Sequence, residues 1–342
     1  MGLQREKASA AMLFLYHRSM TSKPSNPRPP KKPRFPSERQ IRELEQRYVR
    51  RHRLPQLRAT RAVSPAAVEE QLQLEFLDFE RDDVRTKSYP SGHHVIICEG
   101  DSWFNHPWLT NDIPEQLIKF GYSVLHSNRP GKYLQQSYDQ ALFLSPLKDP
   151  RKPQIKALLI SGGGNDLINW EKGNAQFSSI FRKARSDDPT DYINTGNLKA
   201  ALTAVAGWFS GIAVKLRRAD AGRLPVLLHC YDYITPKKFF PHPFKGDWVY
   251  PQLDAIGAPK DPAFRKRIAG ELQRPWIEVY KETCRRLGWH FVVTQDLVHG
   301  RWHDEIHPRN DAFYDITCEY WRVLHKLGVL PSRRIVELPA AA

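Results

Sequence analysis

Beyond residue 93, short apolar runs alternate with longer segments in which apolar residues recur every three or four positions. The short runs are typical of buried strands, and the longer period is typical of helices that bury one face. Strands are expected at 94–98, 122–126, 155–161, 225–230 and 289–294, and helices at 112–120, 197–218, 264–287 and 310–327. Strands that alternate with crossover helices form parallel sheets covered on both faces, so the pattern predicts a three-layer α/β/α sandwich. Its sheet should have five strands and run mainly parallel, which is a flavodoxin-like fold class.

Individual residues refine three of these helices. The segment 197–218 carries an apolar stripe made of Leu198, Leu202, Val205, Phe209, Ile212 and Leu216, which predicts one buried face. Pro275 lacks a backbone donor and is expected to break or kink the helix over 264–287. Asn310 is a good capping residue and is predicted to cap the last helix.

The N-terminal part of the chain differs from the rest in charge and proline content. Residues 1–60 hold fifteen Lys or Arg and four Asp or Glu, so they carry +11 of the formal net charge of +15. Prolines and like charges favour an extended, disordered chain over 22–36. We therefore expect a basic, Pro-rich leader over 1–60 and a connecting helical segment over 61–92. One α/β domain should follow over 93–330, with an aromatic insertion at 235–260 and a tail at 331–342.

The sequence disfavours several classes of protein. No apolar run reaches the roughly 20 residues that span a bilayer. The apolar stretch 10–16 lacks a small-residue cleavage site, so we predict no signal peptide and a cytoplasmic location, with non-classical export left open and Met20 as an alternative start. The cysteines are Cys98, Cys230, Cys284 and Cys318. They form no C-x-x-C pair, so four buried thiols are expected, without a disulfide scaffold, and no metal or cofactor is predicted.

Candidate chemistry follows the predicted strands, where ligands bind to open α/β sheets. Gly100-Asp101-Ser102 comes directly after the first strand, so the Ser102 hydroxyl and backbone N–H can point into the same space at the sheet edge. A capped turn is the plain alternative for these residues. Gly131 follows the second strand and could supply another backbone N–H.

A glycine-rich segment, 161–166, follows the third strand and ends in Gly163-Gly164-Asn165-Asp166. Glycines let a backbone approach a ligand closely, and Asn165 offers a side-chain amide donor. No Gly-Lys-Ser/Thr follows, so the segment is not a phosphate-binding loop.

Asp304 and His307 follow the fifth strand and can meet on one turn. A carboxylate in this position can hold the Nδ1–H of an imidazole and leave Nε2 free to accept a serine proton. His303 and His307 are also four residues apart, as in zinc-binding helices. Pro308 disfavours helical backbone at His307, so a zinc site is the weaker interpretation.

Together these segments, over about 94–327, resemble the SGNH, or GDSL-like, esterases and lipases. The resemblance implies the same α/β/α fold, with Ser102 as nucleophile, His307 as base and Asp304 as its partner. It places Ser102, Gly131 and Asn165 in the oxyanion hole, with Asp101, Gly163 and Asp166 as supporting residues. Trp103 replaces the leucine of the family's name, and the segment around Gly131 departs from the family's second block. His299, Trp302, His303, Trp103 and Trp108 are expected to flank the site.

The resemblance implies hydrolysis of carboxylic esters, with a lipase or acyl esterase and a carbohydrate O-deacetylase both left open. The aromatic residues Phe239, Phe240, Phe244, Trp248 and Tyr250 could line an acyl pocket, stack on sugar rings or pack the insertion. The alternative is a non-enzymatic protein whose basic segment 23–61 binds an anionic surface or nucleic acid. That segment lacks interleaved aromatics, so such binding should be unspecific and salt-dependent.

Overall fold

The structure is a computed structural model that describes residues 29, 32, 94–106, 111–148, 154–168, 180–238 and 247–331. By its internal contacts the chain divides into a unit over Met1–Lys32 and a unit over Pro33–Ala342, and the fold below belongs to the second unit. The predicted leader and connecting segment lie outside the described residues, apart from Pro29 and Lys32.

A five-stranded, wholly parallel sheet forms the middle layer. Its strands are β1 (His94–Glu99), β2 (Ser123–His126), β3 (Gln154–Ile160), β4 (Val226–His229) and β5 (His290–Val292). They lie in the order β2-β1-β3-β4-β5, which is the flavodoxin-like order. The chain first runs from β1 to one edge and then from β3 to the other edge, so the direction reverses between β1 and β3. In such sheets that switch point is where ligands bind.

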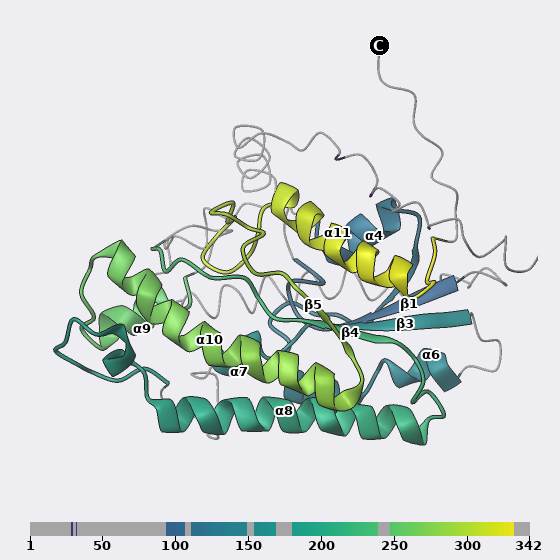
Figure 1. The fold of residues 1–342 in the computed structure, drawn as a ribbon, viewed down its shortest axis with the longest axis horizontal. Helices are drawn as coiled ribbons and strands as arrows, with labels where there is room; N and C mark the ends of the chain where they lie inside the picture. The colour runs from purple at the N-terminus through teal and green to yellow at the C-terminus, as the bar shows by residue number, and fades with distance from the viewer. Residues whose placement is uncertain are drawn as a thin grey trace, which may run out of the picture. The chain divides into compact units, whose positions relative to one another are not determined.

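Helices cover both faces of the sheet (Figure 1). One face carries α4 (Ile113–Lys119) and α11 (Asn310–Lys326), which contact each other. The other face carries α5 (Leu134–Gln140), α8 (Thr195–Arg218) and α10 (Pro262–Leu287), where α8 contacts both neighbours. Right-handed crossovers explain this division, because the β1-to-β2 and β3-to-β4 connections run in opposite directions along the sheet.

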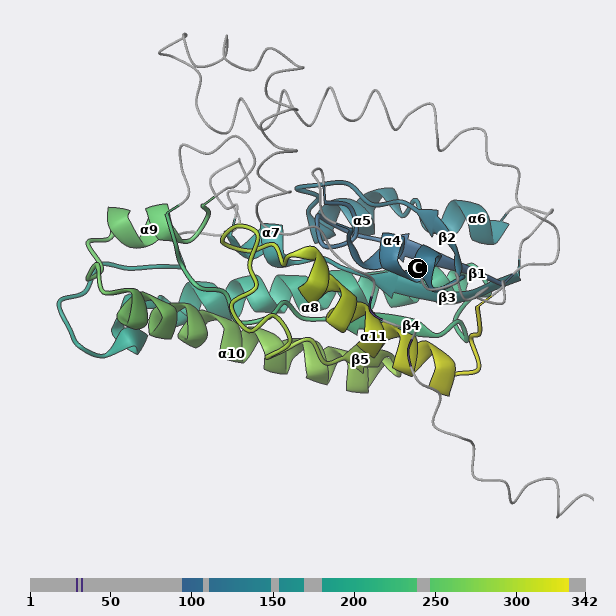
Figure 2. The same ribbon diagram turned by 90° about the horizontal axis from the view of Figure 1, so that it is seen from above.

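The short elements mark the two ends of the sheet. The helix α7 (Gly164–Ile168) follows β3 directly, whereas α6 (Leu144–Lys148) precedes it. Figure 2 shows α7 and α9 (Tyr250–Ala255) at one end of this unit and α6 at the other end. The carboxyl ends of the strands therefore face α7, and a short 3₁₀ helix, η3 (Pro189–Tyr192), contacts α10.

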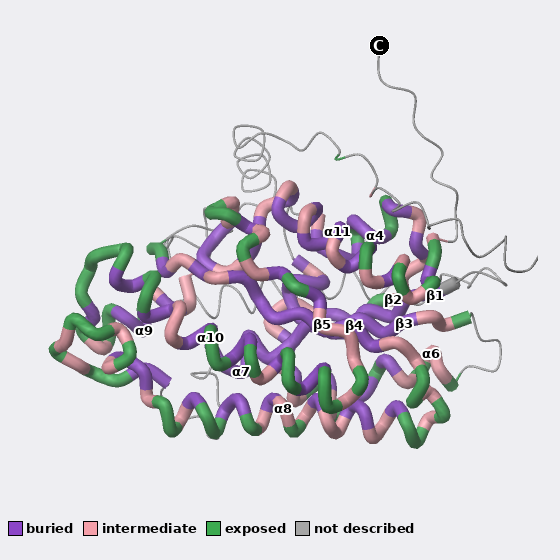
Figure 3. Tube along the Cα trace, in the orientation of Figure 1, coloured by how far each residue is buried: buried purple, intermediate pink, exposed green. Residues whose placement is uncertain are grey.

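The core follows the predicted apolar pattern (Figure 3). Val95, Ile96, Ile97 and Cys98 in β1 are at most 2% exposed. All six residues of the stripe on α8 are buried, and the four cysteines are buried free thiols, as predicted. Among the described helices, α8 has the length and apolar composition of a membrane span. Its apolar stripe packs in the core between the sheet, α5 and α10.

Two of the local predictions differ from the structure. The helix α10 does not break at Pro275 but continues through it, and the flanking residues Leu272, Trp276 and Ile277 are buried, so packing offsets the lost backbone hydrogen bond; a kink at Pro275 stays a prediction. Asn310 is the first residue of α11 and not its cap, which is Arg309. The Asn310 Oδ1 instead accepts from the Asn111 backbone N–H at 2.5 Å, so a tertiary contact takes the side chain that would have capped the helix.

Candidate active site

The nucleophile candidate lies in a tight turn after β1. The Asp101 carbonyl accepts the backbone N–H groups of Phe104 and Asn105, each at 3.0 Å, which closes the turn around Ser102. Gly100 allows the turn because a Cβ at this position would lie 2.3 Å from the Ser161 carbonyl oxygen at the end of β3. The turn therefore sits between β1 and β3, at the switch point of the sheet.

Asp304 and His307 lie in the loop over residues 293–309, between β5 and α11. The Asp304 Oδ2 contacts His307 Nδ1 at 2.8 Å, and its Oδ1 accepts the backbone N–H groups of Ile306 at 3.0 Å and His307 at 2.8 Å. The segment is a closed turn and not a helix, since the His303 N–H donates to the His307 carbonyl at 2.7 Å. One carboxylate thus holds both the ring and the backbone of His307.

The structure brings Ser102 and His307 together. The His307 Nε2 lies 2.7 Å from the Ser102 Oγ, although the two residues come from opposite ends of the domain sequence. Burial alone would raise the pKa of Asp304. The charge and hydrogen bond of His307, with smaller contributions from His303 and His106, outweigh this effect and lower the pKa to about 2. Asp304 is therefore a carboxylate at neutral pH and favours a proton on Nδ1.

Asn165 lies beside Ser102, and both residues line the same small pocket. The Asn165 Nδ2 donates to the Lys132 carbonyl at 3.1 Å, which joins the loop after β3 to the loop after β2. Gly131, next to Lys132, has a φ of +67°, a conformation that favours glycine. Its part in an oxyanion hole stays a prediction.

The supporting residues of the sequence analysis hold the turns in place. The Asp101 Oδ1 accepts the Ser161 hydroxyl at 2.7 Å and the Trp103 N–H at 3.1 Å, and its Oδ2 accepts the Tyr231 hydroxyl. Burial raises the pKa of Asp101, against the lowering effect of these hydrogen bonds. Behind Ser161 lies His229, whose pKa burial lowers to about 3, so the ring is neutral. The nucleophile turn thus rests on a buried polar network.

Asp166 and Gly163 fix the start of α7, the short helix that carries Asn165. The Asp166 carboxylate accepts the Leu134 N–H at 2.8 Å and the Gln135 N–H at 3.4 Å, at the first turn of α5. Burial raises the pKa of Asp166 to about 6, and the hydrogen bonds oppose this rise. Gly163 has a φ of +96°, and a Cβ there would lie 2.0 Å from the Tyr280 hydroxyl oxygen. No other residue type fits that position without movement of Tyr280.

Sequence reasoning missed several contacts that complete the site. The indole N–H of Trp103 donates to the Ile306 carbonyl at 3.1 Å, which ties the nucleophile turn to the base loop. The rings of His106 and Trp248 lie 4.6 and 5.3 Å from the ring of His307. His106 belongs to none of the motifs that the sequence analysis identified. Four aromatic residues of the sequence analysis lie outside the described residues: Trp108, Phe239, Phe240 and Phe244.

Glu305 anchors the end of the aromatic insertion. Its carboxyl oxygens accept the backbone N–H groups of Trp248, Val249 and Tyr250, the last two at 2.8 Å. Burial raises the pKa of Glu305 to about 8, although these hydrogen bonds oppose the rise. The residue next to Asp304 therefore holds Trp248 against the His307 ring.

The possible metal ligands that the structure groups together, among the described residues, are not the pair His303 and His307. His106, Asp304 and His307 instead place one potential ligand atom each within 4.8 Å of one another. Both ring nitrogens of His307 already face partners, Nδ1 toward Asp304 and Nε2 toward Ser102. A metal on His307 would displace one of these contacts, so the donor set fits proton transfer better than metal binding.

No protein-family model and no curated protein sequence matches the chain. Solved structures do match. They include a GDSL-like lipase from Bacteroides thetaiotaomicron (13% identity, 73% of this chain and 97% of that chain, TM-score 0.37). A phospholipase A1 from Streptomyces albidoflavus also matches (12%, 69% and 99%, TM-score 0.42), as does an acetyl xylan esterase (10%, 67% and 99%, TM-score 0.38). These proteins are SGNH or GDSL-like hydrolases, the family that the sequence motifs resemble.

Proposed function

We propose that the chain is a serine esterase that hydrolyses carboxylic esters. The observation that carries this proposal is the unbroken series of contacts from Asp304 through His307 to the Ser102 hydroxyl. A nucleophile within hydrogen-bond reach of a base, which is itself oriented by a third group, is the arrangement of activated serine nucleophiles.

The reaction proceeds in two steps. The Ser102 Oγ attacks the ester carbonyl carbon while its proton moves to His307 Nε2. The bond to the alcohol oxygen then breaks, and that oxygen takes the proton from Nε2. Water attacks the acyl-serine in the second step, gives a proton to His307 and releases the acid, after which Ser102 regains its proton.

Asp304 and Asn165 stabilise the charges that develop during these steps. The Asp304 carboxylate faces the imidazolium that His307 becomes when it accepts the proton. The Asn165 amide, with the backbone N–H groups of Ser102 and Gly131, is proposed to hold the negative oxygen of the tetrahedral intermediate. Fixed donors of this kind act most strongly in a site that excludes water.

Hydrolysis of p-nitrophenyl acetate by wild type and Ser102→Ala tests the proposal. Wild type should release nitrophenol catalytically, and Ser102→Ala should fall to the background rate. Ser145→Ala, at an exposed serine on α6, is the matched control and should keep wild-type activity. Equal activity of Ser102→Ala and wild type, with both proteins folded by circular dichroism, would refute the role of Ser102.

A further inference from the structure

The pocket beside Ser102 has apolar walls and a small volume. Six of its residues present rings or branched side chains: Trp103, Ile168, Tyr231, Ile234, Trp276 and Ile306. All but Ile306 are buried, and Ile306 is half-buried. The cavity volume is about 20 Å³. Roughly 10 to 15 Å³ is enough for one water molecule, so the pocket has room for a group about the size of a methyl.

Two polar side chains in the wall, Gln273 and Tyr231, are already engaged, whereas the buried Trp276 Nε1 has no hydrogen-bond partner among the described residues. Gln273 accepts the Ile234 N–H at 3.0 Å and donates to the Asp232 carbonyl at 2.7 Å. The Tyr231 hydroxyl donates to Asp101 and accepts the Gly164 N–H at 3.3 Å. A ligand in this pocket therefore meets mainly apolar surface.

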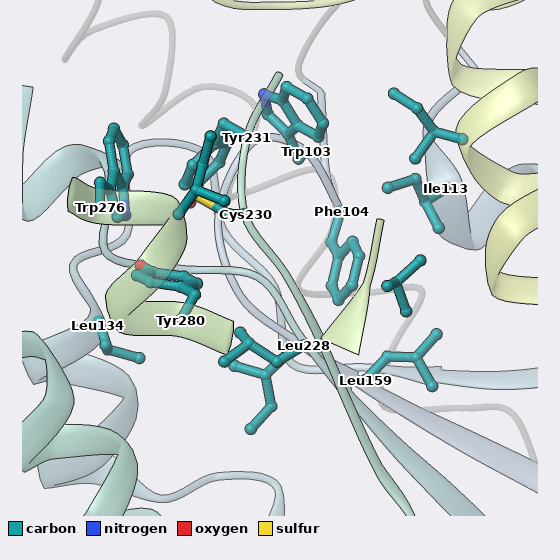
Figure 4. Packing of buried hydrophobic residues seen from close by; sticks show 14 of the residues in the cluster. Trp103, Phe104, Ile113, Leu134, Leu159, Leu228, Cys230, Tyr231, Trp276 and Tyr280 are labelled. Atoms are coloured by element: carbon teal, nitrogen blue, oxygen red, sulfur yellow. The ribbon is translucent and has the colours of Figure 1, made fainter. Parts of the chain in front are cut away.

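The walls are also packed against one another. Tyr231 lies between Trp103 and Trp276, with ring centroids 5.1 and 5.2 Å apart, and Figure 4 shows these rings together. Trp103 also stacks on His229 at 5.2 Å, and the ring of Tyr231 stands nearly perpendicular to both, with centroids 5.1 and 5.4 Å away. Enlarging the pocket would require several buried rings to move together, and close-packed interiors resist such movement.

The position of the pocket separates the two halves of an ester. Ser102 and Asn165 line the pocket, whereas His307 does not. The leaving oxygen must reach His307 Nε2 to take its proton, so the alcohol lies on the side of His307, His106 and Trp248. The acyl group is bonded to the carbon that Ser102 attacks, and it extends away from His307.

From this geometry, and resting on the proposed function, we infer that the pocket is the acyl site and that it selects acetyl esters. The Ser102 Oγ forms a bond to the acetyl carbon, the bond from that carbon to the alcohol oxygen breaks, and the alcohol leaves with the proton from His307. Water then releases acetate. Each methylene beyond acetyl must displace packed side chains, so the acyl chain length is the specificity determinant.

The test compares p-nitrophenyl acetate, butyrate and octanoate on wild type and two variants that widen the pocket. For wild type, kcat/KM should fall at least about tenfold from acetate to butyrate, since one methylene in a fitted pocket changes kcat/KM by about 10- to 200-fold. Ile234→Ala should narrow this ratio by raising kcat/KM for butyrate. Ile168→Ala serves the same purpose if Ile234→Ala fails to fold. Ile118→Ala, at a side chain on α4 that is 47% exposed, is the matched control and should leave the ratio unchanged.

Three outcomes overturn the inference, and only one of them also overturns the proposed function. If wild type hydrolyses p-nitrophenyl octanoate at the same kcat/KM as p-nitrophenyl acetate while Ser102→Ala is inactive, the proposed esterase function stands and the acetyl selectivity is wrong. If wild type hydrolyses none of the three esters, the proposed function fails together with the inference. A ratio that stays unchanged in both folded pocket variants also contradicts the assignment of this pocket to the acyl group.

Discussion

The nucleophile turn and the base loop bring the two halves of the candidate site together by different means. The turn lies three residues after β1, and its position follows from the sheet and from the Asp101 carboxylate. The base loop covers residues 293–309 and contains Asp296 and His299 at φ values of +59° and +49°. Non-glycine residues rarely adopt this conformation, and it persists only where surrounding contacts impose it.

Distant residues impose the shape of the base loop. Asp232, just after β4, accepts the N–H groups of Asp296 and Val298, each at 2.7 Å. Arg301 reaches Asp315 on α11 at 2.8 Å. The Trp103 indole holds the carbonyl of Ile306. The nucleophile turn is thus held by groups that follow the neighbouring strands β3 and β4, whereas the position of His307 depends on contacts of a long loop with α11, with Asp232 and with the nucleophile turn itself.

The largest expected effect within the base loop comes from Asp304→Asn. The amide can no longer hold His307 with a proton on Nδ1, so kcat should fall by about 10,000-fold while the fold is retained. Steady-state kinetics on p-nitrophenyl acetate measure this loss, with Asp187→Asn at an exposed aspartate as the control. A folded Asp304→Asn enzyme with kcat within tenfold of wild type would show that Asp304 does not orient the base.

Asn165→Ala tests the part of the site that lies at the ends of the strands, next to the nucleophile turn. Removing one oxyanion donor should lower kcat by about 100- to 1,000-fold, because the negative oxygen loses a fixed partner. The melting temperature should be measured in parallel, since the Asn165 amide also donates to the Lys132 carbonyl. Unchanged turnover in the folded variant would remove Asn165 from the oxyanion hole.

Trp103→Phe tests the link between the two regions. Phenylalanine keeps an aromatic ring in the core but lacks the N–H that holds the Ile306 carbonyl. One hydrogen bond contributes about 1 kcal/mol, so kcat should fall by about tenfold or less. The KM for p-nitrophenyl acetate should stay nearly unchanged. If KM rises and kcat stays at the wild-type value, Trp103 acts as pocket wall only and does not position the base.

The last effect concerns stability and not turnover, and it is the pH dependence that Asp304 contributes. Its pKa is lowered from 3.8 to about 2 in the folded chain. The carboxylate therefore stabilises the fold above pH 3.8 by at most about 2 kcal/mol, and this contribution is lost as the pH falls through 2. Thermal unfolding of wild type and Asp304→Asn should be measured between pH 6 and 2. The stability of wild type relative to the variant should decrease as the pH falls. A difference that does not change with pH would contradict the lowered pKa.

Much of the sheet and the identity of the candidate residues could be predicted from the sequence, since both depend on short-range pattern. Apolar runs marked the five strands, and the parallel topology placed their ends at one edge. The helix α5 was missed because its residues LQQSYDQ carry almost no apolar stripe, and Asp166 from another segment holds its first turn. The continuity of α10 through Pro275 depends on tertiary packing in the same way.

The contacts of the base loop could not be predicted, because their partners are far apart in the chain. Trp103 and Ile306 are 203 residues apart, and no local pattern pairs them. Asp232 looked like one more polar residue after a strand, yet it holds the backbone of a loop that begins 61 residues further on. The sequence analysis expected Trp103 to flank the site but did not predict its hydrogen bond to Ile306.

Covalent labelling with a fluorophosphonate, followed by peptide mass spectrometry, tests the central claim most directly. The reagent loses fluoride when an activated serine attacks its phosphorus, so the proposed mechanism requires the label on Ser102. His307→Ala should label far more slowly, and the other serines should stay unmodified. Fast labelling of Ser102 that does not depend on His307, or no labelling of Ser102 in the folded wild type, would contradict the claim that His307 activates Ser102.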